Sequence, residues 1–353
     1  MKHIVLGGSA NALAICRQLA SPDTILLDIQ ARAPAYATRH ARSITPASSA
    51  PEDILQAVLD LACAPPQILY PTSDFWLEFI RREAPTLRQN GFLFFQKTCD
   101  CADILLDKLR FFEVMSPHFQ VPYTHAARDA SVSDSQIVKP RRAFIGSKVS
   151  EKGFNGHTIA TGTHVTQQRL NSDLRNHLSI SGLFVAGSLM ASISTRKVLE
   201  YPHPGGTAVL VTTIDSEHLI GRLRSLAEQA LRFLDYEGIF ELEAILQDGE
   251  LWLLEINGRF WLQHAMGSKL GINFSQAYRD TLLGKAPEFQ PRPKGKVVWV
   301  HEGMPVAFIK ASGKAKLDAI KTILGKGRRL VFAHFSPSDA KPLIEFVKCK
   351  LAK

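Results

Sequence analysis

The sequence predicts a mixed fold, α/β in the first hundred residues and α+β in the middle, followed by a small α+β region. In residues 3–28 an apolar run, an amphipathic helix pattern and a second apolar run follow one another, as in a βαβ unit. Residues 67–87 repeat this order, with a strand, a break at Pro71 and a helix. From residue 164 onward, strand patterns come in runs separated by helices, which is typical of α+β proteins.

Four segments define the expected architecture of the middle part and its end. Residues 183–200 and 208–214 alternate or are rich in β-branched side chains, which predicts antiparallel strands. Residues 216–238 carry apolar side chains at helical spacing, and residues 284–296 are rich in proline, glycine and lysine, as linkers are. We therefore expect three parts: an α/β domain over 1–100, an α+β domain over 101–288 and a basic α+β region over 289–353.

The composition favours a globular protein with reduced thiols. The chain has 353 residues, of which 45% are hydrophobic, and this is enough for two or three domains. The five cysteines are scattered and lack zinc-ligand spacing. Gly7 and Gly8 interrupt the apolar start before it reaches the length of a signal segment, and no run is long enough to span a membrane. We therefore expect a cytoplasmic protein without a membrane partner.

The net charge of +9 is concentrated at the carboxyl end. From Arg292 onward, 14 lysines and arginines against 4 acidic residues give a net charge of +10, so the rest of the chain is close to neutral. A basic surface attracts nucleic acid, an anionic surface or an acidic substrate, and the alternative is a solvated lysine-rich face. The aromatic residues of the tail are not interleaved with its lysines as in a stacking platform, which argues against nucleic acid.

Three other kinds of site are disfavoured. Residues 7–12, GGSANA, open the first helix but lack the G-x-G-x-x-G spacing of a dinucleotide site. His203 and His264 have neither the H-E-x-x-H spacing of a zinc site nor a nucleophile partner, so we expect structural roles for both. Ser9 lacks the G-x-S-x-G pattern of a hydrolase.

Residues 240–260, FELEAILQDGELWLLEINGRF, combine a strongly apolar pattern with a series of carboxylates. Asp248 and Gly249 predict the turn of a β-hairpin. A strict two-residue turn would mix charged and apolar side chains on both faces, whereas one extra residue, with Gly249 left-handed in a bulge, would separate them. We therefore predict an odd-length or bulged turn. One face would then carry Phe240, Leu242, Ala244, Leu246, Trp252, Leu254 and Ile256, and the other Glu241, Glu243, Glu255, Asn257 and Arg259.

The polar face of this hairpin predicts a metal site. Carboxylates a few ångströms apart repel each other by about 1 to 4 kcal/mol unless a cation lies between them. Two carboxylates and an amide oxygen suit a hard cation such as Mg²⁺, which also binds phosphate oxygens. The alternative is a hairpin with one solvated face, which the alternation of strands also permits.

The hairpin resembles the metal-binding hairpin of the ATP-grasp superfamily, in which one strand carries a glutamate and the next carries Glu-x-Asn-x-Arg. The resemblance implies that Glu243, Glu255 and Asn257 hold the magnesium ions that bridge the phosphates of ATP, with manganese as the alternative metal. It also implies a catalytic role for Arg259, which would face the transferred phosphoryl group or the reacting carboxylate. Glu241 has no firm counterpart in the family pattern.

Other stretches resemble the same family in the same order along the chain. Lys108 corresponds to an early lysine that contacts the nucleotide, and Lys139, in IVKP, to the lysine that reaches the α and β phosphates. Residues 164–170, HVTQQRL, resemble the hinge between the two lobes, where adenine is usually bound. The nucleotide contacts implied there are Gln167, Gln168 and Leu170. Arg196 and the turn at 205–207 are implied at the phosphate end, with Arg196 as a second catalytic residue. The amino-terminal layer resembles the preATP-grasp domain that precedes ATP-grasp in these enzymes.

Three positions depart from the family pattern. The loop expected to cover the phosphates has two glycines, Gly146 and Gly153, where many relatives are glycine-rich. Its charge would come from Arg141, Arg142 and Lys148. Gln168 stands where an acidic residue is common. Gln263 stands where the biotin-carboxylase branch has a glutamate that serves as a base, and because an amide cannot take that proton, a carboxylase is disfavoured.

The resemblance implies an ATP-dependent carboxylate-amine ligase. ATP would phosphorylate a small-molecule carboxylate, and an amine would attack the acyl phosphate to give an amide, ADP and phosphate. The protein would position the reactants and neutralise developing charge. Two points stay open. The first is an alternative function, in which the protein is a non-catalytic nucleotide sensor or scaffold whose basic region binds an acidic partner. The second is whether the protein assembles as a homodimer.

Overall fold

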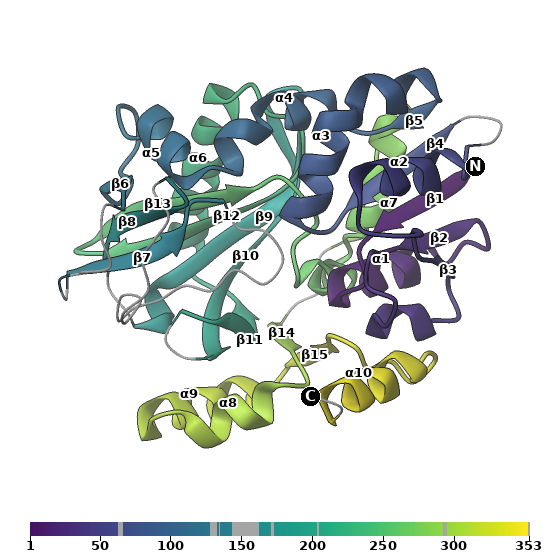
Figure 1. Cartoon of the computed structure of the whole chain (residues 1–353). Coiled ribbons are helices and arrows are strands. Elements are labelled where there is room, and N and C mark those ends of the chain that lie inside the picture. The colour runs from purple at the N-terminus through teal and green to yellow at the C-terminus, as the bar shows by residue number, and fades with distance from the viewer. Residues whose placement is uncertain are drawn as a thin grey trace.

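The computed structural model describes residues 1–62, 66–127, 133, 135–142, 162–170, 173–202, 205–291 and 295–351. The chain forms an amino-terminal α/β half and a second half built on a larger sheet, and its carboxyl-terminal helices and strands lie along one side of both (Figure 1). In the described part of the chain, no helix is long and apolar enough to cross a membrane.

The amino-terminal half contains a parallel five-stranded sheet in the order β3-β2-β1-β4-β5. Its strands are β1 (Lys2–Leu6), β2 (Thr24–Leu27), β3 (Arg42–Ile44), β4 (Gln67–Pro71) and β5 (Phe92–Leu93). The order reverses between β1 and β4, and the crevice outside the carboxyl ends of strands at such a reversal is where open α/β sheets bind ligands. Gly7 and Thr72, which directly follow these two strands, therefore lie at the crevice.

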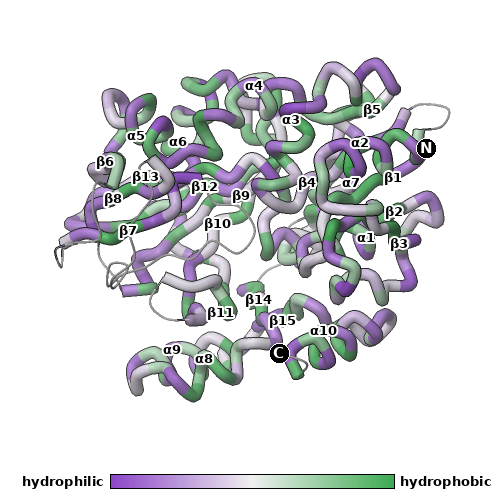
Figure 2. Tube along the Cα trace, viewed as in Figure 1, coloured by the Kyte–Doolittle hydropathy of each residue, from purple (hydrophilic) through white to green (hydrophobic). Residues whose placement is uncertain are grey.

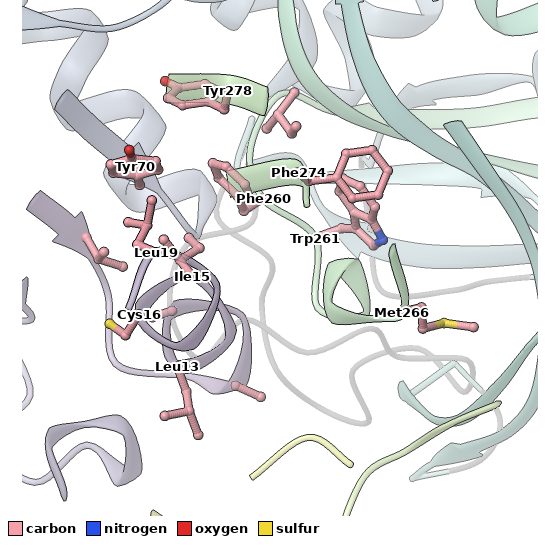
Figure 3. Packing of buried hydrophobic residues seen from close by; sticks show 14 of the residues in the cluster. Leu13, Ile15, Cys16, Leu19, Tyr70, Phe260, Trp261, Met266, Phe274 and Tyr278 are labelled. Atoms are coloured by element: carbon pink, nitrogen blue, oxygen red, sulfur yellow. The ribbon is translucent and has the colours of Figure 1, made fainter. Parts of the chain in front are cut away.

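Helices cover both faces of this sheet. They are α1 (Ala10–Leu19), the 3-10 turn η1 (Pro34–Ala37), α2 (Pro51–Leu59), α3 (Asp74–Gln89) and α4 (Gln96–Leu105). Because side chains alternate along a strand, Ile4 packs towards α2 and α3 and Val5 towards α1. Figure 3 shows Ile15 and Leu19 of α1 beside Tyr70 and Phe260, so the core of this half continues into the second half.

The larger sheet has seven strands in the order β13-β12-β9-β10-β11-β14-β15. Its strands are β9 (His177–Val185), β10 (Ser188–Tyr201), β11 (Thr207–Thr213), β12 (Gly238–Gln247), β13 (Glu250–Asn257), β14 (Val297–Val300) and β15 (Arg329–Phe332). One face packs on α5 (Lys108–Met115) and α6 (Glu217–Phe233). On the other face, Leu183, Ile193 and Ile239 join the core shared with the amino-terminal half. The polar residues of that face therefore point towards the junction of the two halves.

Smaller elements complete the second half. A three-stranded sheet in the order β6-β8-β7 consists of β6 (Thr124–Ala126), β7 (Gln136–Pro140) and β8 (His164–Gln168). The remaining elements are η2 (Leu174–Asn176), η3 (His264–Leu270), α7 (Phe274–Leu282), α8 (Met304–Lys310), α9 (Gly313–Leu324) and α10 (Lys341–Leu351). Parallel and antiparallel sheets in the two halves confirm the predicted combination of α/β and α+β classes.

The hairpin of β12 and β13 has the predicted faces only in the half that is farther from the turn. The predicted turn is wrong. Gln247 pairs with Glu250, so Asp248 and Gly249 form a strict two-residue turn, with φ angles of 52° and 83°. Both angles are positive, as in the type I′ turn that suits the twist of a hairpin. The extra residue is instead Leu254, in a bulge between the pairs Glu243–Glu255 and Ala244–Leu253.

The bulge divides the hairpin into two registers. Beyond it, Glu241 pairs with Asn257 and Glu243 with Glu255, so these four residues share a face as predicted. Between the bulge and the turn the pairing shifts by one residue. Leu251 and Leu253 therefore pack with the apolar core of this sheet, where Trp252 and Leu254 were expected.

The basic carboxyl-terminal region adds strands to the larger sheet. β14 pairs antiparallel with β11, and β15 pairs parallel with β14. Apolar and polar segments alternate along α8, α9 and α10 (Figure 2), and Leu317 and Leu324 of α9 are exposed. The domain boundaries at residues 100 and 288 stay predictions. Elements on either side of the second boundary pack on other parts of the chain, since α7 packs on the amino-terminal half and β14 pairs with the middle sheet.

Candidate active site

Two rows of polar side chains cross the larger sheet where it faces the amino-terminal half. Strand pairing places Glu255, Glu243, Ser179 and Thr195 in one row across β13, β12, β9 and β10. The next row contains Asn257, Glu241 and Ser181. The carboxylates and hydroxyls therefore form one continuous polar surface.

The carboxylates of this surface interact strongly with each other and with Lys197. Lys197 Nζ donates a hydrogen bond to Glu243 Oε2 at 2.8 Å. Burial would by itself raise the pKa of Glu243, but the charge and hydrogen bond of Lys197 hold this pKa below its ordinary value. Among the described residues no cation is hydrogen-bonded to Glu241, and burial together with the charge of Glu243 raises the pKa of Glu241 to about 8. A second cation beside these carboxylates would stabilise their ionised forms.

Arg259 is held between the hairpin and the amino-terminal half. Its Nε donates to Asp74 Oδ1, at the start of α3, at 2.8 Å, and its Nη2 donates to Asn257 Oδ1 at 3.1 Å. Asn257 Nδ2 in turn donates to Glu255 Oε1 at 3.4 Å. Burial would lower the pKa of Arg259, but the charges of Asp74 and Glu241 raise it. Arg259 is therefore a fixed cation at the edge of the carboxylate cluster.

The backbone next to Arg259 is also tied to the amino-terminal half. Phe260 N–H donates to Pro71 O at 3.0 Å, and Asn11 Nδ2 donates to Phe260 O at 2.9 Å and to Thr72 O at 2.7 Å. Asn11 is 3% exposed, so its side chain is committed to these contacts. The position of Arg259 thus depends on both halves of the protein.

The small sheet brings predicted nucleotide residues towards the cluster. Lys139 Nζ donates to Gln167 Oε1 at 2.9 Å, and Gln167 Nε2 donates to Thr124 Oγ1 at 3.0 Å. Burial lowers the pKa of Lys139, the carboxylates of Glu255 and Glu243 oppose that change, and the positive charge of Lys108 adds to it. Lys139 therefore lies within electrostatic range of both Lys108 and the carboxylates.

The other residues of the predicted hinge lie at the end of β8. Gln168 N–H donates to Tyr123 O at 2.8 Å, and Gln168 Oε1 accepts from Tyr123 N–H at 3.3 Å. Leu170 is 8% exposed and follows this strand. The structure places Gln167 in contact with Lys139, whereas Gln168 supports the adjoining loop.

The structure does not bring Arg196 to this surface. Arg196 Nη1 donates to Asp318 Oδ2 on α9 at 3.1 Å, and its Nη2 donates to Asp318 Oδ1 at 3.3 Å. Lys197 points to the other side of β10 because neighbouring residues of a strand alternate. Sequence reasoning missed Lys197, although Thr195 and Lys197 have the spacing of two that would place them on one face.

Several predicted features lie elsewhere. Arg141 and Arg142 donate to Asp107 from their Nε atoms, at 2.8 and 3.4 Å. His264 is fully buried, its Nδ1 donates to Trp261 O at 3.0 Å, and burial lowers its pKa to about 4. Gly146, Lys148, Gly153 and His203 are outside the described residues.

A cavity of about 340 Å³ lies over the carboxylates, between the two halves. Glu241, Glu243, Lys197 and Arg259 line it from the larger sheet and its hairpin. The amino-terminal half contributes Ser9, Asn11, Thr72 and Ser73, which lie at the crevice of the parallel sheet. The oxygens of Glu243, Glu255 and Asn257 are a donor set that could hold Mg²⁺, and Lys139 and Lys108 could hold phosphate groups beside it.

Comparison with known proteins identifies the family of this site. Residues 105–261 match the family model of the ATP-grasp domain. No curated protein sequence matches the chain. Among solved structures, N5-carboxyaminoimidazole ribonucleotide synthetase from Thermus thermophilus has a TM-score of 0.60 at 18% identity, covering 83% of this chain and 81% of that one.

Two further structures share the fold. The L-amino acid ligase from Bacillus licheniformis has a TM-score of 0.61 at 14% identity, covering 82% of this chain and 78% of that one. Phosphoribosylglycinamide synthetase from Anaerococcus prevotii has a TM-score of 0.57 at 15% identity, covering 81% and 76%. The match over residues 105–261 confirms the resemblance to the ATP-grasp superfamily that the hairpin predicts, and the similar structures share the fold of this chain.

Proposed function

We propose that this protein is an ATP-dependent ligase that activates a small-molecule carboxylate as an acyl phosphate and joins it to an amine, releasing ADP and phosphate. The observation that carries the proposal is that Glu243, Glu255 and Asn257 share one face of the hairpin and Arg259 donates to Asn257, beside a cavity that both halves line. The similar structures include proteins named as synthetases and as an amino acid ligase, which supports the reaction class.

The nucleotide would lie between the small sheet and the hairpin. Glu243, Glu255 and Asn257 would hold Mg²⁺, or Mn²⁺ as the alternative, and the metal would neutralise charge on the phosphates. Lys139 and Lys108 would bind phosphate oxygens, and the segment with Gln167, Gln168 and Leu170 would contact the base. The pKa of Glu241 is consistent with the metal assignment, because burial and then the charge of Glu243 raise it to about 8, and a cation beside the two carboxylates would oppose both effects.

The reacting carboxylate would lie in the cavity of about 340 Å³. Arg259 and Lys197 supply fixed positive charge there, and Lys197 takes the role that the sequence assigned to Arg196. Their task is to orient the carboxylate towards the phosphoryl donor and to stabilise the charge that develops in transfer. Ser73 and Thr72 line the opposite wall, so the amino-terminal half would limit the access of water.

A matched pair of substitutions on β13 tests the proposal. Glu255→Ala removes a metal-binding carboxylate, whereas Glu250→Ala removes an exposed carboxylate near the turn that pairs only with Arg222, at 3.6 Å, among the described residues. ADP formation is measured with ATP, Mg²⁺ and pools of carboxylates and amines. We expect Glu255→Ala to reduce the rate by at least about 10²-fold and Glu250→Ala to leave it unchanged.

Two results would contradict the proposal. Full turnover in Glu255→Ala would show that the metal assignment is wrong. No ADP formation by the wild type with any pool, together with no Mg²⁺-dependent thermal shift by ATP, would favour the nucleotide sensor or scaffold instead. A thermal shift without turnover would keep nucleotide binding and reject the ligase.

A further inference from the structure

A second cavity, of about 1170 Å³, adjoins the first, and its lining includes neither Arg259 nor the residues proposed to hold the metal. Both cavities are lined by Ser9, Thr72, Ser73, Thr207 and Leu262, so they form one continuous space. The walls of the larger cavity come from the crevice of the parallel sheet on one side and from the carboxyl-terminal region on the other. A substrate whose reacting carboxylate lies near Arg259 would extend into this space.

The wall from the parallel sheet presents a buried carboxylate without a cation. Asp28 follows β2, is 7% exposed and lines the cavity. It packs so closely against Gly8 that a Cβ on Gly8 would lie 2.7 Å from Asp28 Oδ2. Burial raises the pKa of Asp28, backbone N–H groups including that of Gln30 oppose this, and no ion pair of Asp28 is found among the described residues. Buried carboxylates are normally paired, so this one lacks the cation that would stabilise it.

The wall from the carboxyl-terminal region presents a second acceptor. His334 is 4% exposed, lines the cavity and lies 2.7 Å from Glu302 Oε2 through its Nδ1. Glu302 Oε1 accepts the backbone N–H groups of His334 and Phe335 at 2.7 and 2.9 Å, so its position is fixed. Because Glu302 is ionised, His334 Nδ1 donates to it, and in the neutral imidazole the lone pair is then on Nε2, where it can accept from a ligand. No partner of Nε2 is found in the described part of the chain.

A metal ion explains this wall less well. His301, Glu302 and His334 offer ligand atoms within 4.8 Å of one another. However, Glu302 is occupied by His334 and two backbone N–H groups, and His301 Nδ1 accepts from Gly303 N–H at 2.9 Å. His301 therefore carries its proton on Nε2 and would have to lose it to bind a metal. His334 alone is then ready to act as a ligand, whereas catalytic zinc sites have three protein ligands.

The cations around the cavity are at its exposed rim. The side chain of Lys348 is 65% exposed and pairs with Glu345 at 2.6 Å. Arg32 and Lys350 are also exposed. The buried groups that face the interior are acceptors, Asp28 and the carboxylate-bound His334, so the interior favours a positively charged ligand.

The two walls are fixed relative to each other. Asp339 Oδ2 accepts from Thr38 Oγ1 at 2.7 Å and from Arg17 Nε at 3.0 Å. Arg17 Nη2 also donates to His334 O at 2.7 Å. α1 therefore holds the segment that carries His334. Direct hydrogen bonds thus fix the two walls of the cavity relative to each other.

We propose that this cavity binds a substrate through a protonated nitrogen, with Asp28 as its counter-ion and Nε2 of His334 as a second hydrogen-bond acceptor. The inference rests on the proposed function, which places a carboxylate at Arg259. A substrate that spans both cavities is then an amino carboxylate, with its carboxylate at the reaction end and its ammonium group at Asp28.

Binding experiments test this without relying on turnover. The probes are β-alanine, 4-aminobutanoate and lysine, each compared with its N-acetylated analogue, and D-ribose as a hydroxyl probe. Melting temperature and calorimetric affinity are measured on the full chain with Mg²⁺ and ADP. The variants are Asp28→Asn and His334→Gln, with Glu345→Gln at the exposed rim of the same cavity as the control.

We expect at least one amino carboxylate to bind the wild type and its acetylated analogue to bind at least tenfold more weakly. Asp28→Asn and His334→Gln should each weaken that binding by about tenfold or more, and Glu345→Gln by less than twofold. The thermal shift by ATP and Mg²⁺ reports whether each variant folds. If Asp28→Asn fails that check, His334→Gln carries the test.

Four results would overturn the proposal: no binding of any amino carboxylate, equal binding of the acetylated analogues, unchanged affinity in the variants, or ribose binding that Asp28→Asn abolishes. Stoichiometric Zn²⁺ binding that His334→Gln abolishes would also overturn it, in favour of a metal site. A failure of the proposed function can be distinguished from a failure of this inference. In that case the amino carboxylate would bind to the protein but ADP would not form.

Discussion

Lys197 Nζ lies 2.8 Å from Glu243 Oε2, so a lysine of β10 and a glutamate of β12 form an ion pair across the intervening strand β9. The neighbouring Arg196 points to the opposite face and pairs with Asp318. Replacing Lys197 by methionine removes the cation and leaves a carboxylate unpaired. We expect Lys197→Met to lower the rate of ADP formation by about 10²- to 10³-fold, the usual effect of removing one fixed donor.

Arg196→Gln is the matched control for that substitution. Within the described part of the chain it breaks only the pair with Asp318, and we expect less than about a threefold change in rate, since pairs near the surface contribute little. An equal loss of rate in both variants would restore Arg196 as a catalytic residue. Steady-state ADP formation with the same substrate pool decides between the two.

Asp74 is expected to act as a positioning residue for Arg259. Asp74→Asn removes the charge that holds Arg259 Nε at 2.8 Å. We expect kcat to fall by about 10- to 10²-fold, because small displacements of a catalytic group are costly, while the affinity for ATP and Mg²⁺ is retained. Glu78→Gln on the same helix breaks an ion pair with Arg81 and should change neither quantity. A weakened nucleotide affinity with unchanged kcat would argue against this role.

Gly249 is required by the conformation of the turn. Its φ is 83°, and no atom lies within 4 Å of the point that a Cβ would occupy, so a substitution meets backbone strain without a clash. We expect Gly249→Ala to lower the free energy of unfolding by about 1 to 2 kcal/mol, measured by urea denaturation. Gly313→Ala, which also meets open space but lies at the start of α9, should cost nothing. Equal losses in both variants would contradict a type I′ turn.

The pair of Glu302 and His334 predicts a loss of stability in acid. Burial would raise the pKa of Glu302, but the hydrogen bonds from the side chain and backbone of His334 lower it from an ordinary value of 4.5 to about 2. A carboxyl group with a depressed folded-state pKa stabilises the protein above its unfolded pKa, and this contribution falls as the pH drops from about 4.5 towards 2. Urea midpoints at pH 7 and pH 4 should therefore differ more for the wild type than for Glu302→Gln. Parallel changes in both proteins would exclude the Glu302 carboxylate as the cause.

The sequence alone determined the parts of the fold and site that follow from local periodicity. The βαβ opening, the hairpin and the common face of Glu241, Glu243, Glu255 and Asn257 result from the period of two along a strand, which residues close in sequence reveal. The family pattern also identified Arg259. These features can be predicted without knowing which distant segments of the chain are in contact.

The tertiary structure decided what depends on contacts between distant segments. The common face of Glu241, Glu243, Glu255 and Asn257 is compatible with a bulged turn or with a bulge at Leu254. The core that packs against Leu251 and Leu253 selects the second. Lys197 rather than Arg196 reaches the carboxylates because pairing of β9 with β10 and β12 sets the direction of each side chain. The bond from Asp74 to Arg259 joins residues 185 positions apart, and no local pattern encodes it, since its energy exists only once the two halves pack together.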